Sequence, residues 1–414
     1  MKKLAVVVLA LALLAAACGD DDDTAETTTS AGESAATTTT AATGDGDGDG
    51  DGDGDGDGDG DGDGDGDGDG DGSMEVAACA PGQVDGDLDL YNWSEYIEPE
   101  LIPAFEAAYG VSVVETFYDS NEAMLAQVEA GGAAYDLIVP SDYMVSIMGE
   151  EGLLIPLNRE AIPNWDNLDP TFLGLPFDPS NTYSAAYQWG TTGIGFNYEA
   201  VGEDYEESWA MIFEPDEAYF GKISLLNDAR EVMGAALKYL GYSVNTTSQE
   251  ELDEAVELIK DMRDALAKFD SDQFEDDLVA GETMVAHGYS GDFFSAFDEA
   301  SDDDYDAYED FGYIIPLEGA VAWVDNMAIP TTADAICTAH TFIDFILDAE
   351  NGAALTNFNY YASPNLAATA FIDPEILEDT TIYPPEDVFE RLEFIADTGD
   401  FELNYQDAFQ AIKN

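Results

Sequence analysis

The sequence predicts an α/β fold for the part of the chain from about Cys79 onward. Short apolar segments typical of strands alternate there with segments of helical periodicity, which favours a largely parallel sheet. This part holds about 336 residues, enough for two domains by the usual size prior. In addition, aromatic and acidic residues follow several of the strand-like segments.

The first five elements follow from the local pattern. We expect Leu88–Trp93 to form a strand, Glu98–Tyr109 a helix and Val111–Tyr118 a second strand. Asn121–Ala130 is expected to be a helix, and Tyr135–Pro140 a short buried strand. Strand and helix thus alternate from the start of the folded region.

A later helix has the clearest amphipathic pattern. Ser248 and Glu251 have the spacing of a capping box at its start. Its predicted apolar face consists of Leu252, Ala255, Val256, Ile259, Met262 and Leu266.

Aromatic and acidic residues follow four strand-like segments. They lie in the segments 93–96, 141–143, 228–231 and 323–325. Ligands of open α/β sheets bind beyond the carboxyl ends of the strands. We therefore expect these side chains to meet at one rim.

The N-terminus has the features of an export signal. Lys2 and Lys3 precede an apolar run, Leu4–Ala17, which is shorter than the about 20 residues of a membrane-spanning helix. The run ends at Cys18 and resembles a bacterial lipobox, although Ala15 stands where leucine is usual. We expect residues 1–18 to be a lipoprotein signal peptide with lipid attached to Cys18. The alternative is an ordinary signal peptide in which this cysteine is incidental.

Residues 19–82 are expected to form a disordered acidic tether. They include a Gly-Asp repeat from Gly44 to Gly72, and they have too few apolar side chains to offset the entropy of ordering. Alternating Asp resembles the first half of an EF-hand loop, but no Glu stands at position 12. We expect no defined calcium site there.

The charge balance excludes one class of partner. The chain has 90 acidic and 11 basic residues, and the part from Cys79 onward alone has 69 and nine. Nucleic acid is excluded, because phosphate binding needs a basic face. The acidity is consistent with surface adaptation to saline surroundings or with focusing of a cationic ligand.

The two cysteines beyond Cys18 are expected to pair. Cys79 and Cys337 would form a disulfide in an oxidising compartment, pinning the start of the domain to a distant helix. Cys337 and His340 have a metal-like spacing, but the chain has only two histidines and no second ligand pair. We expect neither a metal nor a cofactor.

The aromatic and acidic residues suit a flexible alkyl chain that carries ammonium groups. Its methylenes need apolar walls, and each ammonium needs a carboxylate or a ring face, the latter contributing roughly 0.5–2 kcal/mol. The candidate walls are Trp93, Tyr96, Tyr143, Tyr289 and Trp323. The candidate charges are Glu95, Asp228, Glu231 and Asp325.

The folded region resembles the spermidine/putrescine-binding proteins of ABC transporters along nearly its whole length. The segments that carry the resemblance are Leu90–Tyr96, Tyr118–Glu122, Tyr135–Ser141, Trp189–Gly195, Asn227–Val232, Trp323–Pro330 and Pro364–Ala368. The resemblance implies a type II periplasmic-binding-protein fold with two lobes and a hinge, composed of residues 83–193 plus 324–369 and 194–323 plus 370–414. It also implies an extracytoplasmic protein, expected to be a monomer, that closes on a polyamine and docks on a membrane permease.

The resemblance implies the residues of the site as well. The ligand-binding positions are Trp93, Ser94, Glu95, Tyr96, Tyr143, Asp228, Glu231, Tyr289, Trp323, Asp325 and Tyr361. Tyr289 stands where tryptophan is common, and Ile395 where a glutamine can contact a terminal amine. These departures leave the choice between spermidine and putrescine open. Arg230 is expected to brace its neighbours without touching the ligand.

Three other interpretations remain. The ligand could be another small cationic amine, or the chain could be a secreted hydrolase with paired carboxylates. Gly288–Gly291 lacks the last glycine of a serine nucleophile elbow, and two histidines make a general base scarce. A purely structural lipoprotein does not account for the aromatic residues. We therefore expect a binding protein and not an enzyme.

Overall fold

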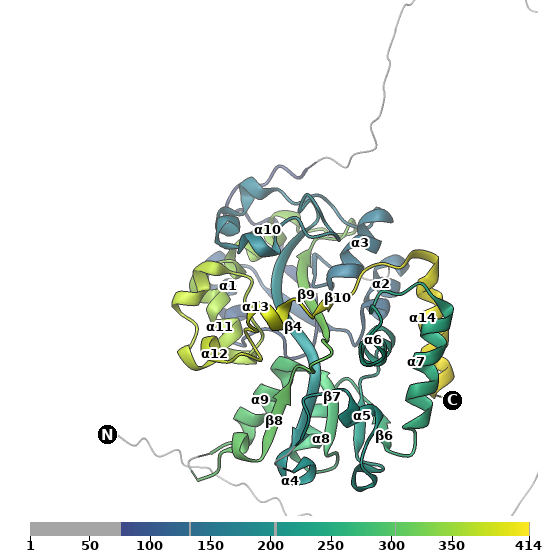
Figure 1. The fold of residues 1–414 in the computed structure, drawn as a ribbon. Helices are drawn as coiled ribbons and strands as arrows, with labels where there is room; N and C mark the ends of the chain where they lie inside the picture. The colour runs from purple at the N-terminus through teal and green to yellow at the C-terminus, as the bar shows by residue number, and fades with distance from the viewer. Residues whose placement is uncertain (1–75, 132–133, 203–204, 303, 414) are drawn as a thin grey trace, which may run out of the picture. The chain divides into compact units, whose positions relative to one another are not determined.

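We analysed a computed structural model of the chain, which describes residues 76–413 except 132–133, 203–204 and 303 (Figure 1). The expected signal peptide, Cys18 and the Gly-Asp repeat lie outside the described residues. Within the described ranges, no helix is long and apolar enough to cross a membrane.

The described domain is built on one mixed sheet. The strands, in their order across it, are β2 (Val113–Phe117), β1 (Leu88–Asn92), β3 (Leu137–Ile138), β9 (Val321–Ala328), β4 (Ser184–Asn197), β7 (Val285–Tyr289), β5 (Ile223–Leu225) and β6 (Leu266–Phe269). Two further strands pair at the side of this path, β10 (Glu393–Phe394) with β9 and β8 (Phe311–Ile314) with β4.

The expectation of a largely parallel sheet was wrong for the middle of the molecule. β1 pairs in parallel with β2 and β3, and β5 with β6 and β7, so each half is parallel. β4, however, is antiparallel to β7, β8 and β9. β4 and β9 are long strands that run from one half into the other (Figure 1), and the chain passes through them in opposite directions.

Helices cover both halves of the sheet. In chain order they are α1 (Leu101–Tyr109), α2 (Asn121–Ala130), α3 (Asp142–Glu150), α4 (Tyr198–Val201), α5 (Ala210–Phe213), α6 (Ala229–Leu240), α7 (Gln249–Asp261), α8 (Phe274–Val279), α9 (Ser290–Ala300), α10 (Ile336–Ile346), α11 (Ala349–Asn359), α12 (Pro374–Glu378), α13 (Glu386–Phe389) and α14 (Glu402–Lys413). The C-terminal α14 lies beside α7 and α6 (Figure 1).

The expected order of the first elements is confirmed, with differences at their ends. α1 begins at Leu101 and not at Glu98, where Pro99 disfavours a helical conformation. α7 ends at Asp261, so Leu266 belongs to β6 and not to the helical face.

The capping box of α7 is only half formed. The Ser248 hydroxyl accepts the backbone N–H of Glu251 at 3.4 Å, as expected. The Glu251 carboxylate, however, accepts a hydrogen bond from the Thr246 hydroxyl. The Ser248 N–H donates to the same Thr246 hydroxyl, so this threonine takes the place of the reciprocal bond.

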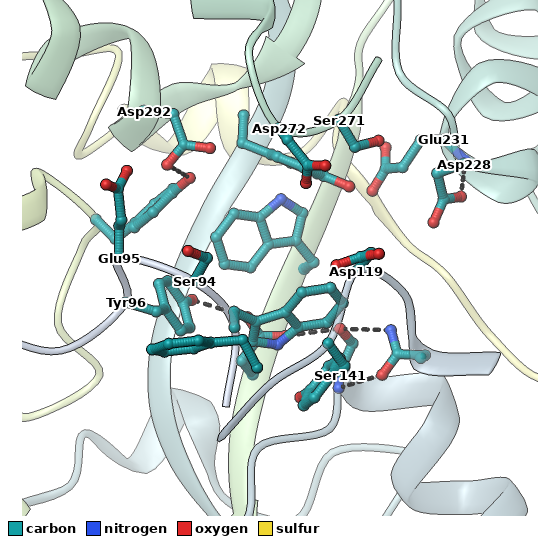
Figure 2. Close-up of a pocket in the computed structure, with 18 of the residues that line it drawn as sticks. Ser94, Glu95, Tyr96, Asp119, Ser141, Asp228, Glu231, Ser271, Asp272 and Asp292 are labelled. Atoms are coloured by element: carbon teal, nitrogen blue, oxygen red, sulfur yellow. Dashed lines mark hydrogen bonds between the residues drawn. The ribbon is translucent and has the colours of Figure 1, made fainter. Parts of the chain in front are cut away.

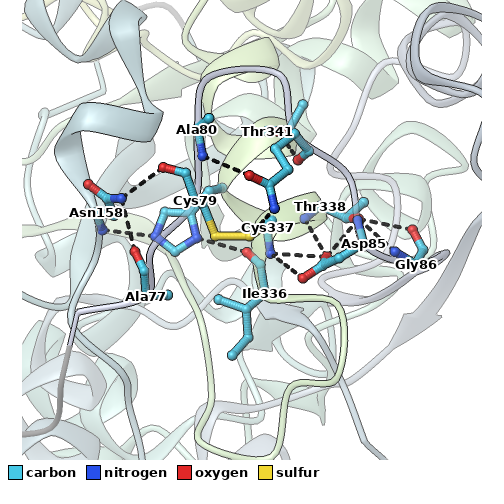
Figure 3. Close-up of a disulfide and its surroundings, with 12 residues drawn as sticks. Ala77, Cys79, Ala80, Asp85, Gly86, Asn158, Ile336, Cys337, Thr338 and Thr341 are labelled. Carbon is cyan, nitrogen blue, oxygen red and sulfur yellow. Dashed lines mark hydrogen bonds between the residues drawn. A yellow bond between two sulfur atoms is a disulfide. The ribbon is translucent and has the colours of Figure 1, made fainter.

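A disulfide joins Cys79 to Cys337 on α10, with 5.3 Å between their Cα atoms (Figure 3). Beside it, the Asn158 side-chain amide donates to the carbonyl oxygens of Ala77 (2.9 Å) and Cys79. His340 Nε2 accepts the backbone N–H of Asn158. The start of the domain is thus pinned to α10. No group of three or more metal-ligating side chains occurs in the described part of the chain.

The segment after α11 stays beside that helix before it reaches β10. The Asp373 N–H donates to Asn357 Oδ1 at 2.9 Å, and the Ser363 N–H donates to the Tyr383 hydroxyl at 3.1 Å. The chain therefore passes to the other half of the sheet close to β10, beyond residue 383.

Candidate ligand-binding cleft

A cavity of about 330 Å³ lies where the two halves of the sheet meet. Its walls come from the ends of β1, β2, β3, β5, β6 and β7 and the segments that follow them, from β9 itself, and from Tyr361 and Ile395. All of the expected ligand-binding residues line it. Figure 2 labels Ser94, Glu95, Tyr96, Asp228 and Glu231 among them. The other lining residues are Phe117, Tyr118, Asp119, Asn121, Ser141, Asp142, Ser271, Asp272, Glu275, Asp292 and Ile395.

Trp93 and Glu95 follow β1 directly. The Trp93 indole N–H donates to the carbonyl oxygen of Val139 at 3.0 Å, and its ring lies 4.5 Å from that of Tyr118. Glu95 has a φ of 56°, a left-handed conformation that is uncommon outside glycine. The loop between β1 and α1 therefore turns sharply at the cavity.

A series of edge-to-face rings forms the aromatic wall. Tyr96 and Tyr361 lie 5.3 Å apart between ring centroids, Tyr361 and Trp323 5.0 Å, and Trp323 and Tyr289 5.9 Å. Tyr361 follows Tyr360, whose φ of 60° ends α11. The wall thus joins residues from both halves of the sheet.

Trp323 and Asp325 lie inside β9, although we expected them to follow a strand. Being two residues apart, they lie on the same face of it. β9 passes the cavity on its way between the halves, so its middle forms part of the wall. Gly190 of β4 pairs with Trp323 of β9, and a Cβ atom on residue 190 would lie 2.7 Å from the indole. Glycine is therefore needed for the ring to pack on β4.

Asp325 is a buried carboxylate with both oxygens engaged. The Ser141 hydroxyl donates to its Oδ1 at 2.7 Å, and the Tyr96 hydroxyl donates to its Oδ2 at 2.8 Å. Burial raises the pKa of Asp325 to about 7, and these two hydrogen bonds oppose the rise.

Asp228 and Glu231 lie at the start of α6. Asp228 caps the helix, its Oδ1 accepting the N–H groups of Arg230 (2.8 Å) and Glu231 (3.0 Å). Burial raises the pKa of Asp228. Burial, together with the charge of Asp228, raises the pKa of Glu231 well above its ordinary value. Glu231 Oε2 is buried and has no hydrogen-bond partner in the described structure.

Arg230 does not line the cavity, as expected. Its guanidinium donates to Glu402 at 2.6 Å and lies 4.4 Å over the ring of Tyr405. It also donates to the Ala396 carbonyl oxygen. Arg230 thus braces the start of α6 against α14.

Sequence reasoning missed several lining carboxylates, notably Glu275 and Asp292. The Tyr361 hydroxyl donates to Asp292 Oδ1 at 2.5 Å. Burial raises the pKa of Asp292 to about 7, helped by the charge of Glu95. Burial and the charge of Asp292 raise the pKa of Glu275 to about 9. The local signals were weak: Asp292 follows Tyr289 by three residues, and Glu275 directly follows Phe274.

The lining has one sign of charge. Nine carboxylates contribute to it, and no Lys, Arg or His is among the residues that line this cavity: the acids are Glu95, Asp119, Asp142, Asp228, Glu231, Asp272, Glu275, Asp292 and Asp325. A cavity with carboxylates and aromatic rings but no base attracts cations. It can hold ammonium groups by charge and by ring faces.

Comparisons with known proteins agree with this chemistry. The family model of bacterial extracellular solute-binding proteins matches residues 100–384. The spermidine/putrescine-binding periplasmic protein of Escherichia coli is 36% identical over 327 residues, covering 79% of this chain and 91% of that protein.

Solved structures agree as well. The spermidine/putrescine ABC transporter substrate-binding protein of Streptococcus pneumoniae is 32% identical, with a TM-score of 0.68 over 80% of this chain and 99% of that one. The TpPotD lipoprotein of Treponema pallidum is 33% identical, with a TM-score of 0.70 over 78% and 98%. The expected two-lobed periplasmic-binding-protein fold is confirmed. The chain belongs to the bacterial extracellular solute-binding protein family, and its relatives there include spermidine/putrescine-binding proteins.

Proposed function

We propose that this protein captures polyamines of the spermidine/putrescine type outside the cytoplasm and delivers them to an ABC permease. One observation carries the proposal: a single cavity combines a wall of aromatic rings with nine carboxylates and no base. The names of the relatives support the same ligand class and an extracytoplasmic location.

The carboxylates are distributed along the cavity. Figure 2 shows Glu95 and Asp292 together at one end and Asp228 and Glu231 at the other. In our proposal, each end holds a terminal ammonium group. Asp325 holds a further ammonium between the rings of the aromatic wall, where each cation–π contact adds roughly 0.5–2 kcal/mol.

The delivery step rests on two lobes that close around the ligand. We propose that the lobes have the bounds expected from the sequence, residues 83–193 plus 324–369 and residues 194–323 plus 370–414, except that the last boundary moves from 369 to beyond 383. The contacts of Asp373 and Tyr383 with α11 and its neighbours favour a second crossing nearer to β10. The closed monomer would dock on the permease, without catalysis and without a cofactor.

We further propose that lipid on Cys18 anchors the protein to the membrane. The apolar run that ends at this cysteine supports the idea, and so does the lipoprotein nature of the Treponema pallidum relative. Labelling with a palmitate analogue in the native host tests it. A Cys18→Ser variant should lose the label.

Isothermal titration with putrescine, spermidine and spermine tests the proposed ligand. We expect one-to-one binding of at least one of them. Asp325→Asn should weaken that binding by about 3 kcal/mol, or more than a hundredfold, because a buried ammonium loses its charge partner. Asp348→Asn, a cap of α11 where asparagine serves equally well, is the matched control. Absence of heat and of any thermal shift with all three amines would refute the proposed function.

A further inference from the structure

Asn121 is a buried amide whose role is explained neither by its helix nor by the apolar core. It is the first residue of α2, only 4% exposed, and the cap of that helix is Ser120. Burying an amide costs free energy unless its groups are hydrogen-bonded. The partner of Asn121 is Ser141, which lies in the turn between β3 and α3.

The two residues are joined by a pair of hydrogen bonds. Asn121 Nδ2 donates to Ser141 Oγ at 3.0 Å, and Asn121 Oδ1 accepts the backbone N–H of Ser141 at 3.1 Å. Only a side-chain amide offers a donor and an acceptor in this arrangement; a carboxylate of the same shape has no donor. Ser141 is therefore held at both its backbone and its hydroxyl (Figure 2).

These two hydrogen bonds decide where the hydrogen of the Ser141 hydroxyl points. A hydroxyl has one hydrogen to donate and two lone pairs. Because Asn121 donates to the oxygen, the hydrogen is left for Asp325 Oδ1, 2.7 Å away. The Tyr96 hydroxyl donates to the other oxygen of Asp325, so the plane of this carboxylate is fixed.

We propose that Asn121 is a positioning residue for ligand binding, which acts through the Ser141 hydroxyl to fix the Asp325 carboxylate that receives an ammonium group. The inference rests on the proposed function, because it assigns a role within the same cleft. Asn121 and Ser141 follow β2 and β3, which both pair with β1, and Asp325 forms a β-bridge with Ser141, so all three residues meet in one half of the sheet. This series of hydrogen bonds from Asn121 through Ser141 to Asp325, called the relay below, is therefore formed before the ligand arrives. It requires no closure of the cleft.

A double-mutant cycle tests the relay. The variants are Asn121→Asp, Ser141→Ala and the combination of the two, titrated with the polyamine that the parent binds. Each single change should weaken binding by about tenfold or more, because a hydrogen bond to a charged group is lost or redirected. The double variant should bind the polyamine about as tightly as the single variant with the lower affinity. Both changes break the same series of hydrogen bonds, from Asn121 through Ser141 to Asp325, so their effects should not add.

Asn365→Asp is the matched control. Asn365 is 2% exposed, its side-chain amide donates to the Leu347 carbonyl oxygen, and neither residue is among those that line the cavity. It should lose thermal stability as Asn121→Asp does but keep the parent's affinity. If Asn121→Asp does not fold, Asn121→Ala, which favours the helix, replaces it in the cycle.

The outcomes separate this inference from the function on which it rests. Parent-like affinity of the Asn121 variant, or losses that add in the double variant, would overturn the relay while leaving polyamine binding intact. A parent protein that binds no polyamine would overturn the proposed function, and the relay with it. Loss of affinity in the Asn365 control equal to that of the Asn121 variant would show a general effect of destabilisation.

Discussion

Lowering the pH from 8 to 6 should weaken polyamine binding, because two carboxylates of the cleft have pKa values near 7. Burial raises the pKa of Asp325 to about 7 against the hydrogen bonds of Ser141 and Tyr96. Burial also raises the pKa of Asp292 to about 7. A carboxylate must be ionised to pair with an ammonium group, so protons compete with the ligand at both positions.

The size of the effect follows from the two pKa values. At pH 8 both groups are mostly ionised. At pH 6, one unit below its pKa, each is ionised in about a tenth of the molecules, and one pKa unit corresponds to about 1.4 kcal/mol. The dissociation constant should therefore rise by about tenfold if one of the groups contacts the ligand. It should rise by about a hundredfold if both do.

Isothermal titration at pH 8, 7 and 6, in two buffers of different ionisation enthalpy, measures both affinity and proton release. We expect one to two protons to be released per ligand at pH 6. The Asp325→Asn variant should release about one proton fewer. An unchanged dissociation constant between pH 8 and pH 6, with equal heats in both buffers, would show that neither carboxylate takes up a proton in competition with the ligand.

The stability of the ligand-free protein should change in the opposite direction. The folded pKa of Asp325 is raised above its ordinary value of 3.8. Its contribution to stability is therefore fully present below about pH 4 and is lost as the pH rises through 7. The melting temperature without ligand should rise between pH 8 and 6, while the stabilisation that the polyamine adds should shrink. Thermal melts with and without spermidine separate the two effects.

Three further predictions concern the core, the disulfide and one end of the cleft. His287 is 1% exposed, neither ring nitrogen has a partner in the described structure, and burial lowers its pKa to about 3. His287→Leu should raise the melting temperature by about 2–4 °C at unchanged affinity, and a lower temperature would contradict this. Replacing both Cys79 and Cys337 by Ser should cost about 2–5 kcal/mol in a urea titration, a loss that reductant should reproduce in the parent. Glu275→Gln with Asp292→Asn should weaken spermidine binding by about tenfold and putrescine binding less, because only the longer amine reaches both ends; equal losses would show that this end does not sort ligands by length.

The parts of the cleft that could be predicted from the sequence are those built by neighbours in the chain. Trp93 and Tyr96 follow one strand, and Asp228 and Glu231 follow another. Since the carboxyl ends of parallel strands face the same edge of a sheet, local patterns suffice to bring such groups together. The alternation of strands and helices is likewise a local property, and its order was predicted correctly.

The remaining parts depend on contacts between segments far apart in the chain. Asp292 becomes part of the site because Tyr361, 69 residues later, donates a hydrogen bond to it. Trp323 lines the cavity because β9 pairs with β4 in an antiparallel register more than 130 residues apart in sequence. No periodicity encodes such pairings. A search for acids beside aromatic residues finds Phe274–Glu275 and Asp292–Phe293, but it cannot tell which of the many such pairs reach the cleft.

The position of the acids separates the two explanations of the chain's charge. A carboxylate on the open surface is hydrated and serves solubility. In the cleft, burial raises the pKa values of the carboxylates, and neighbouring acids add to the rise, as Asp228 does for Glu231 and Asp292 for Glu275. The repulsion between these neighbouring carboxylates costs free energy. A lysine or arginine would relieve this repulsion permanently and remove the reason to bind. Aromatic rings attract a cation but do not neutralise the acids. The repulsion between the carboxylates is therefore relieved only when a ligand with several positive charges binds. For this reason, rings and carboxylates together indicate a polyamine more strongly than either group alone.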